Sequence, residues 1–139
     1  MLVSAFSHRL PLERHLTARS ATLTTPSVVA GAAFGAYVDV RAGSPTYGTV
    51  VTAQLVPGAQ VLVPRGVANG FQATAPGDTQ YLYCFDQEWA PGMPGLACSP
   101  LDPALAIPWP LPVDVDDRAQ VSAKDLGAPA FADLEGMAR

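Results

Sequence analysis

Tyr83 is the side chain in this sequence best suited to deliver a proton. It lies in the segment 79–85 (TQYLYCF), whose residue types and alternation are typical of a β-strand. A phenol on an inward strand face can protonate a carbanion when a neighbouring group sets its acidity. A buried tyrosine more often serves as a core aromatic with a hydrogen-bonded hydroxyl, so both roles stay open for Tyr83.

Lys124 and Asp125 are two further candidates, and they belong to an S-x-x-D pattern that begins at Ser122. At this spacing a serine hydroxyl and a carboxylate cap the start of a short helix. Lys124 would then simply be solvated. On the residues alone this structural role is favoured, and a role in a site is the alternative.

The segment 64–70 (PRGVANG) has the outline of the second cupin motif, P-x-G-x-x-H, in which a barrel-strand histidine binds a metal or the substrate. Asn69 stands at the histidine position. An amide is a poor ligand for transition metals, and residues 28–139 contain no histidine, so we expect neither a metal site nor a cofactor. The structural alternative is a turn in which Asn69 bonds to its own backbone.

The elements that must position these residues are short strands with Gly/Pro turns between them. In segment 34–41, Ala36, Val38 and Val40 share one face, while Tyr37, Asp39 and Arg41 share the other. Segment 79–85 places Tyr81, Tyr83 and Phe85 on one face. Further strands are predicted over 49–56, 60–63 and 69–75. This pattern predicts an all-β sandwich or jelly-roll barrel.

Two loops complete the predicted domain. The turn-forming residues of segment 39–48 (DVRAGSPTYG) connect two of the strands, with Gly43 and Gly48 free to adopt unusual backbone angles. The proline-rich stretch 89–112 has no periodicity and is expected to wrap the surface as an extended loop.

Residues 1–27 differ in composition from residues 28–139, and we expect the division of the chain to fall between them. The first segment has a net charge of +2 and the remainder −6, and both histidines, His8 and His15, belong to the first. A disordered arm and a short helix are equally favoured for residues 1–27, and a targeting peptide less so.

The bulk composition excludes several classes of protein. The chain has 139 residues, of which 49% are apolar, enough for one domain with a core. No apolar run approaches the ~20 residues of a membrane span, and the net charge of −4 argues against nucleic-acid binding. Cys84, in a predicted strand, and Cys98, in a predicted loop, are interpreted as free thiols of a cytoplasmic protein.

Six segments, in order, resemble the C-terminal part of the dTDP-4-dehydrorhamnose 3,5-epimerase family. They extend over residues 34–134 and read VDVRAGSPTYG (38–48), VPRGVANGF (63–71), YLY (81–83), WAP (89–91), DPALAIPWP (102–110) and VSAKD (121–125), the last followed by Ala128 and Pro129. The resemblance implies a cupin-type jelly roll, or double-stranded β-helix, that is incomplete at its N-terminal side.

The resemblance also implies a reaction in dTDP-rhamnose-type deoxysugar biosynthesis. The substrate would be a dTDP-4-keto-6-deoxyhexose, whose C3 and C5 protons are acidic because each carbon adjoins the ketone. The family uses a His–Asp pair as base and a tyrosine as donor. By position, Tyr83 is expected to be the donor and Asp125 the aspartate, with Lys124 and Asn69 contacting the substrate in a homodimer.

The chain also departs from the family pattern. The base of the family lies in an R-G-x-H segment that this sequence lacks, and His15 is not assigned that role. Glu88 and Pro94 replace an aromatic that stacks on thymine and a glutamate that binds the nucleotide. The alternative hypothesis is therefore a truncated, catalytically inactive relative that acts only as a structural, dimerising β-domain.

Overall fold

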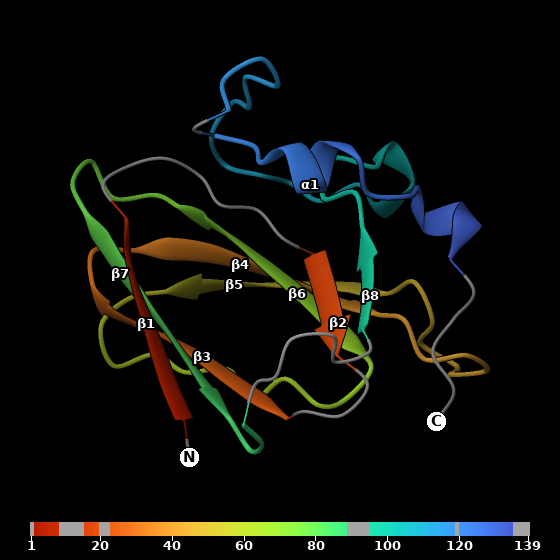
Figure 1. Ribbon diagram of the computed structural model, residues 1–139, viewed down its shortest axis with the longest axis horizontal. Coiled ribbons are helices and arrows are strands. Elements are labelled where there is room, and N and C mark those ends of the chain that lie inside the picture. The colour runs from red at the N-terminus through yellow and green to blue at the C-terminus, as the bar shows by residue number, and fades with distance from the viewer. Residues whose placement is uncertain (1, 9–15, 20–22, 89–94, 119, 135–139) are drawn as a thin grey trace.

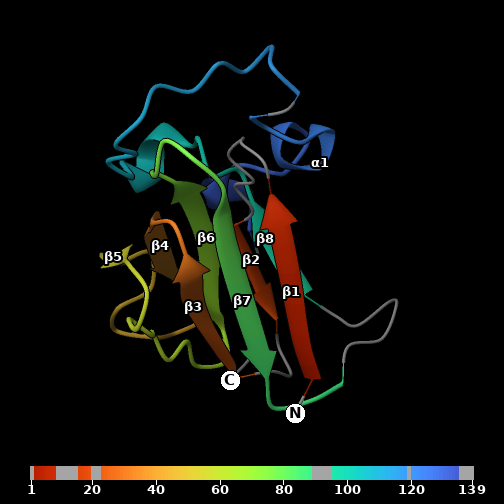
Figure 2. The same ribbon diagram turned by 90° about the vertical axis from the view of Figure 1, so that its left-hand side faces the viewer.

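The computed structural model describes residues 2–8, 16–19, 23–88, 95–118 and 120–134, and its strands form two facing antiparallel sheets (Figure 1). The smaller sheet has the strand order β1 (Leu2–His8), β7 (Thr79–Phe85) and β3 (Thr24–Ala30). The larger has the order β5 (Val50–Leu55), β4 (Ala33–Asp39), β6 (Val67–Ala73), β2 (Leu16–Arg19) and β8 (Gly95–Cys98). In Figure 2 the smaller sheet lies in front of the larger one.

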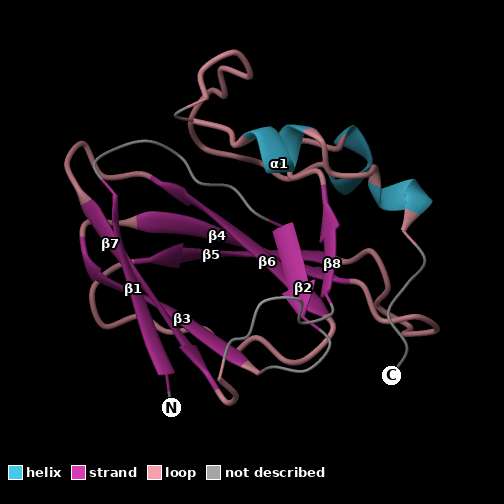
Figure 3. Cartoon of the chain, viewed as in Figure 1, coloured by secondary structure: helices cyan, strands magenta, loops and turns pink. Residues whose placement is uncertain are grey.

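Helical structure in the described part of the chain is confined to three short pieces near the C-terminus (Figure 3). They are η1 (Pro103–Leu105), α1 (Ala123–Leu126) and η2 (Phe131–Asp133). The prediction of an all-β fold is therefore confirmed. No described helix is long and apolar enough to cross a membrane.

Most predicted strands are close to the observed ones. Segment 79–85 matches β7 at both ends, and β4, β5 and β6 differ from their predicted ranges by two residues or fewer. Segment 60–63 makes only isolated bridges to β3, at Ser27–Gln60 and Thr24–Val63. Pro26 lies between these bridges and has no N–H to donate, so a continuous ladder cannot form there.

The expectations for residues 1–27 need correction. The backbone is extended in β1, β2 and the start of β3, in place of a disordered arm or a helix, and the expected boundary at residue 28 falls inside β3. β1 pairs along its whole length with β7, and β2 pairs with β8 and, at Thr17–Asn69, with β6. These partners lie far along the chain, so the local pattern of residues 1–27 did not reveal them.

Two cores lie on opposite faces of the larger sheet. Between the sheets, five buried side chains pack together: Val28, Ala33, Leu55, Phe71 and Tyr81. On the outer face a second cluster consists of Val38, Val40, Ala68, Cys98 and Leu105. The two faces of β4 are therefore both covered, and each of its seven residues is buried.

The C-terminal segment supplies the cover for the outer face. The Trp109 ring packs edge-on against Phe34 of β4, and its Nε1 donates to the carbonyl of Pro100. The fully buried Gln72 of β6 holds the main chain of Leu111 with two hydrogen bonds of 3.0 Å, one donated and one accepted. The described part of the stretch expected to be an extended loop contains strand β8 and helix η1, and Cys98 ends β8 instead of lying in a loop.

The loop between β4 and β5 is organised around the nearly buried carboxylate of Asp39. This carboxylate accepts hydrogen bonds from Arg41 (backbone N, Nε and Nη2), from Ser44 Oγ and from Thr46 Oγ1, at 2.6–3.0 Å. The Arg41 side chain lies directly over Gly66, at φ +74°, where a β-carbon would collide with Arg41 Cγ. The hydrogen bonds of Arg41 and the hydroxyls hold the pKa of Asp39 far below its usual range.

Candidate functional site

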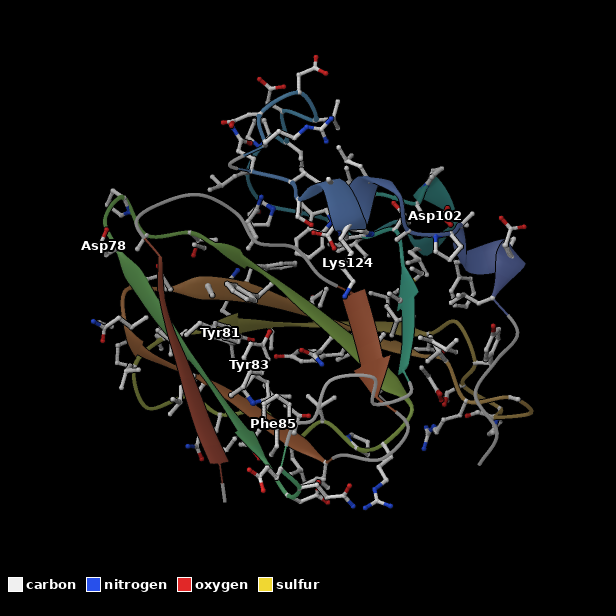
Figure 4. All side chains as sticks on the ribbon, viewed as in Figure 1. Asp78, Tyr81, Tyr83, Phe85, Asp102 and Lys124 are labelled. Atoms are coloured by element: carbon white, nitrogen blue, oxygen red, sulfur yellow. The ribbon has the colours of Figure 1, made fainter. Side chains whose placement is uncertain are left out.

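Tyr83 lies on β7 in a row of aromatic rings directed into the space between the sheets (Figure 4). Its ring centroid is 4.9 Å from that of Tyr81 and 5.9 Å from that of Phe85. From the opposite sheet, Phe71 stacks on Tyr81 at 3.8 Å and meets the Tyr83 ring edge-on at 6.4 Å. The prediction that the three β7 aromatics share one face is confirmed, and Tyr83 itself is only half-buried.

Asn69 contributes to the same inter-sheet space from β6. It lies two residues before Phe71 and therefore on the same strand face, and it pairs with Tyr37 of β4. The turn predicted for this segment does form, with the N–H of Val67 donating to Pro64 O, but Asn69 lies beyond it in the strand. The structure therefore brings Asn69 and Tyr83 to one space from opposite sheets.

Asp125 and Lys124 lie on α1, at the end of the sandwich where β2 begins (Figures 1 and 2). The Ser122 hydroxyl accepts a hydrogen bond from the Asp125 N–H at 3.1 Å and donates one to Asp125 Oδ2 at 2.7 Å. The predicted helix cap is confirmed. Asp125 is buried and Lys124 is exposed, with its side chain labelled in Figure 4.

Two tyrosines that the sequence did not single out for chemistry, Tyr37 and Tyr81, lie buried beside this space. Burial raises the pKa of Tyr37 to about 12, an effect that the nearby Tyr81 hydroxyl partly opposes. Burial, and after it the Tyr83 and Tyr37 hydroxyls, also raises the pKa of Tyr81. The sequence did contain a signal for the position of Tyr37. The alternation in segment 34–41 placed Tyr37 on the strand face opposite to the one that carries Val38 and Val40.

Clusters of metal-binding side chains are absent from the described ranges. No group of three or more His, Cys, Asp or Glu side chains there is arranged to hold a metal ion. Glu88 is exposed, while His15 and Pro94 lie outside the described residues. The candidate residues are therefore aromatic hydroxyls and one amide between the sheets, and two charged residues on α1.

The whole arrangement is similar to known proteins. The family model for dTDP-4-dehydrorhamnose 3,5-epimerase matches residues 15–133. Among curated relatives, the enzyme of that name from Mycobacterium tuberculosis is 36% identical over 109 residues, covering 76% of this chain and 52% of the relative. The one from Sinorhizobium fredii is 40% identical over 107 residues, covering 75% and 51%.

A solved structure supports the same relationship. The dTDP-6-deoxy-D-glucose-3,5-epimerase RmlC of Legionella pneumophila, in complex with dTDP-4-keto-L-rhamnose, superposes with a TM-score of 0.83 at 29% identity, covering 97% of this chain and 71% of that chain. The prediction of a cupin-type jelly roll is confirmed by this superposition. The chain spans about half the length of the curated relatives it matches.

Proposed function

This chain belongs to the dTDP-4-dehydrorhamnose 3,5-epimerase family, and from that membership we propose that it epimerises a dTDP-linked 4-keto-6-deoxyhexose. The ketone acidifies the protons at C3 and C5. A base removes one of them, the electron pair delocalises onto the ketone oxygen as an enolate, and a donor on the opposite face returns a proton to the same carbon. The configuration at that carbon is thereby inverted.

The placement of Tyr83 carries this proposal. Its ring is fixed by Tyr81 and Phe85 on its own strand and by Phe71 across the sheets. The residue is half-buried, so part of its side chain remains accessible from outside the core. A held phenol in that position suits a proton donor, since a donor must meet the reacting carbon in one geometry.

The other predicted residues have supporting roles in this proposal. Asn69 supplies an amide to the sugar from the sheet facing Tyr83, and Lys124 supplies a positive charge to the diphosphate from the exposed surface of α1. Asp125 orients the imidazole that acts as base. In this proposal the chain acts as a homodimer. Light scattering at the protein concentration of the assay measures the molar mass and tests this assembly.

The base comes from one of two histidines in this proposal. His8 is the last residue of β1, and His15, outside the described residues, is the first residue that the family model matches. Alanine substitution at each position assigns the base, because only the variant that lacks it loses proton removal. Activity in both single variants and in the double variant would exclude a histidine base.

The direct test is product formation. Purified protein is incubated with dTDP-4-keto-6-deoxy-D-glucose, and the sugar is analysed by NMR for inversion at C3 and C5. We expect epimerised product above the buffer control at one or both carbons. A sugar recovered in its original configuration, at any protein concentration up to that of the substrate, would reject the proposed function.

Replacing Asp125 by asparagine tests its orienting role. The side chain keeps its shape, so the fold should be retained, but the charge that supports an imidazolium is lost, and we expect kcat to fall by about tenfold. The measurement is the initial rate of epimerisation, with thermal unfolding recorded alongside.

Ser122→Ala is the matched control for the structural role of Asp125. It removes the helix cap and should cost about 1 kcal/mol of unfolding free energy. If Asp125→Asn epimerises at the wild-type rate, Asp125 acts only in the cap. If it loses activity without the destabilisation seen in Ser122→Ala, the orienting role stands.

A further inference from the structure

Two hydroxyl groups are buried in the protein without a hydrogen-bond partner among the described residues: those of Tyr37 and Tyr81. The two side chains are only 6% and 2% exposed. A buried polar group that makes no hydrogen bond costs folding free energy, and phenylalanine would fill the same space without that cost. The presence of two such groups beside the candidate donor therefore calls for a functional explanation.

The Tyr81 ring belongs to the aromatic group that holds Tyr83, and Tyr37 lies on β4 opposite Asn69 of β6. The Tyr37 hydroxyl lies over Gly35 of its own strand, where a β-carbon would be 2.5 Å from Oη. Gly35 pairs with Phe71, and the Phe71 ring stacks on Tyr81. The absence of a side chain at Gly35 thus leaves room for the Tyr37 hydroxyl next to the rings that line the site.

The hydroxyls also influence one another electrostatically. The centroids of the Tyr81 and Tyr83 rings are 4.9 Å apart, and burial, and after it Tyr83 and Tyr37, raises the Tyr81 pKa. The raised pKa values of Tyr37 and Tyr81 keep both protonated at neutral pH. Each therefore has an O–H available to donate.

We propose that Tyr81 and Tyr37 are positioning residues for Tyr83, with the Tyr81 hydroxyl directed at Tyr83 Oη and the Tyr37 hydroxyl supporting Tyr81 from behind. This inference rests on the proposed function. When the Tyr83 O–H bond breaks and its proton moves to the sugar carbon, Oη becomes negatively charged. A hydrogen bond from Tyr81 stabilises that charge without transfer of the Tyr81 proton. Tyr83 then regains a proton from water before the next turnover.

The test uses Tyr37→Phe, Tyr81→Phe and the double variant, because each substitution removes only an oxygen. Tyr47→Phe is the matched control, since Tyr47 is 37% exposed and packs on Phe131, away from the site. Reactions with dTDP-4-keto-6-deoxy-D-glucose are run in D₂O. NMR measures the epimer formed and the deuterium incorporated into the recovered, unepimerised sugar.

We expect Tyr81→Phe to lower kcat for epimerisation by about tenfold, with KM unchanged, and Tyr37→Phe to have a smaller effect in the same direction. The base can still remove a proton and return deuterium to the same face. The ratio of deuterium in recovered sugar to epimer formed should therefore rise in both variants and stay at the wild-type value in Tyr47→Phe. The melting temperatures of the Tyr37 and Tyr81 variants should equal or exceed that of the wild type.

Three other outcomes would overturn the positioning role or the proposed function. Wild-type kcat and deuterium ratio in both variants would overturn the positioning role while leaving the proposed function intact. A fall in melting temperature with an unchanged deuterium ratio would mean that the hydroxyls serve only the fold. Absence of both exchange and epimer in the wild type would reject the proposed function, and this inference with it.

Discussion

Replacing Tyr83 by phenylalanine is expected to lower the rate of epimerisation by roughly 10²–10⁴-fold, the contribution of one positioned acid–base group. The phenyl ring retains the contacts with Tyr81, Phe85 and Phe71, so the aromatic row should be preserved. Only the transferable proton is lost. The loss should appear in kcat, because the ring still offers the same surface to the sugar.

The measurement is steady-state epimerisation followed by NMR, with circular dichroism and thermal unfolding on the same samples. Tyr47→Phe serves again as the control and should keep the wild-type rate. Deuterium exchange without inversion should survive in Tyr83→Phe, because proton removal uses a different group. A Tyr83→Phe variant that epimerises within twofold of the wild type would show that the proton is donated by another group.

Replacing Asp39 by alanine should have the largest effect on stability, lowering the free energy of unfolding by about 3 kcal/mol. The substitution removes an acceptor that serves three donors of Arg41 and two hydroxyls. Ser44 and Thr46 then lose the group that holds the 41–48 loop. Urea unfolding at neutral pH measures the change, and Asp78→Ala, which removes an exposed carboxylate in a turn, is the control.

The pH dependence of stability gives an independent check on Asp39. Its pKa is lowered in the folded protein, so the carboxylate contributes stability above the unfolded pKa of about 3.9, and this contribution is lost as the pH falls below it. The difference in unfolding free energy between wild type and Asp39→Ala should therefore shrink on acidification from about pH 5 towards pH 2. A difference independent of pH would contradict the charged hydrogen-bond network.

The sequence predicted the central strands well because their signals are local. In segment 79–85 every second residue from Tyr81 onward is aromatic, and turn-forming residues precede the segment. The observed strand has the same ends as the predicted one. Segment 60–63 failed as a strand because Pro26, in a different part of the chain, prevents a ladder. β1 and β2 were missed because they are extended through pairing with β7 and β8, and residues 1–27 carry no periodicity of their own.

The candidate site was predictable to a similar extent. Strand alternation placed Tyr83 with Tyr81 and Phe85, and the motif around Asn69 placed that residue on a barrel strand. The partners of these residues were not predictable. The hydroxyl of Tyr37 occupies the space that a β-carbon at Gly35 would need, and Gln72 meets Leu111 across 39 residues of chain. Such contacts depend on packing between distant segments, which single-residue patterns do not encode.

We propose above all that this chain removes and returns a proton beside the ketone of a nucleotide-linked sugar. Incubation of the purified protein with dTDP-4-keto-6-deoxy-D-glucose in D₂O tests it directly, with mass and NMR analysis of the recovered sugar. We expect deuterium at C3, at C5 or at both, at a rate proportional to protein concentration and above that of buffer alone. Deuterium incorporation equal to that of buffer, with correctly folded protein at substrate-level concentration, would contradict it.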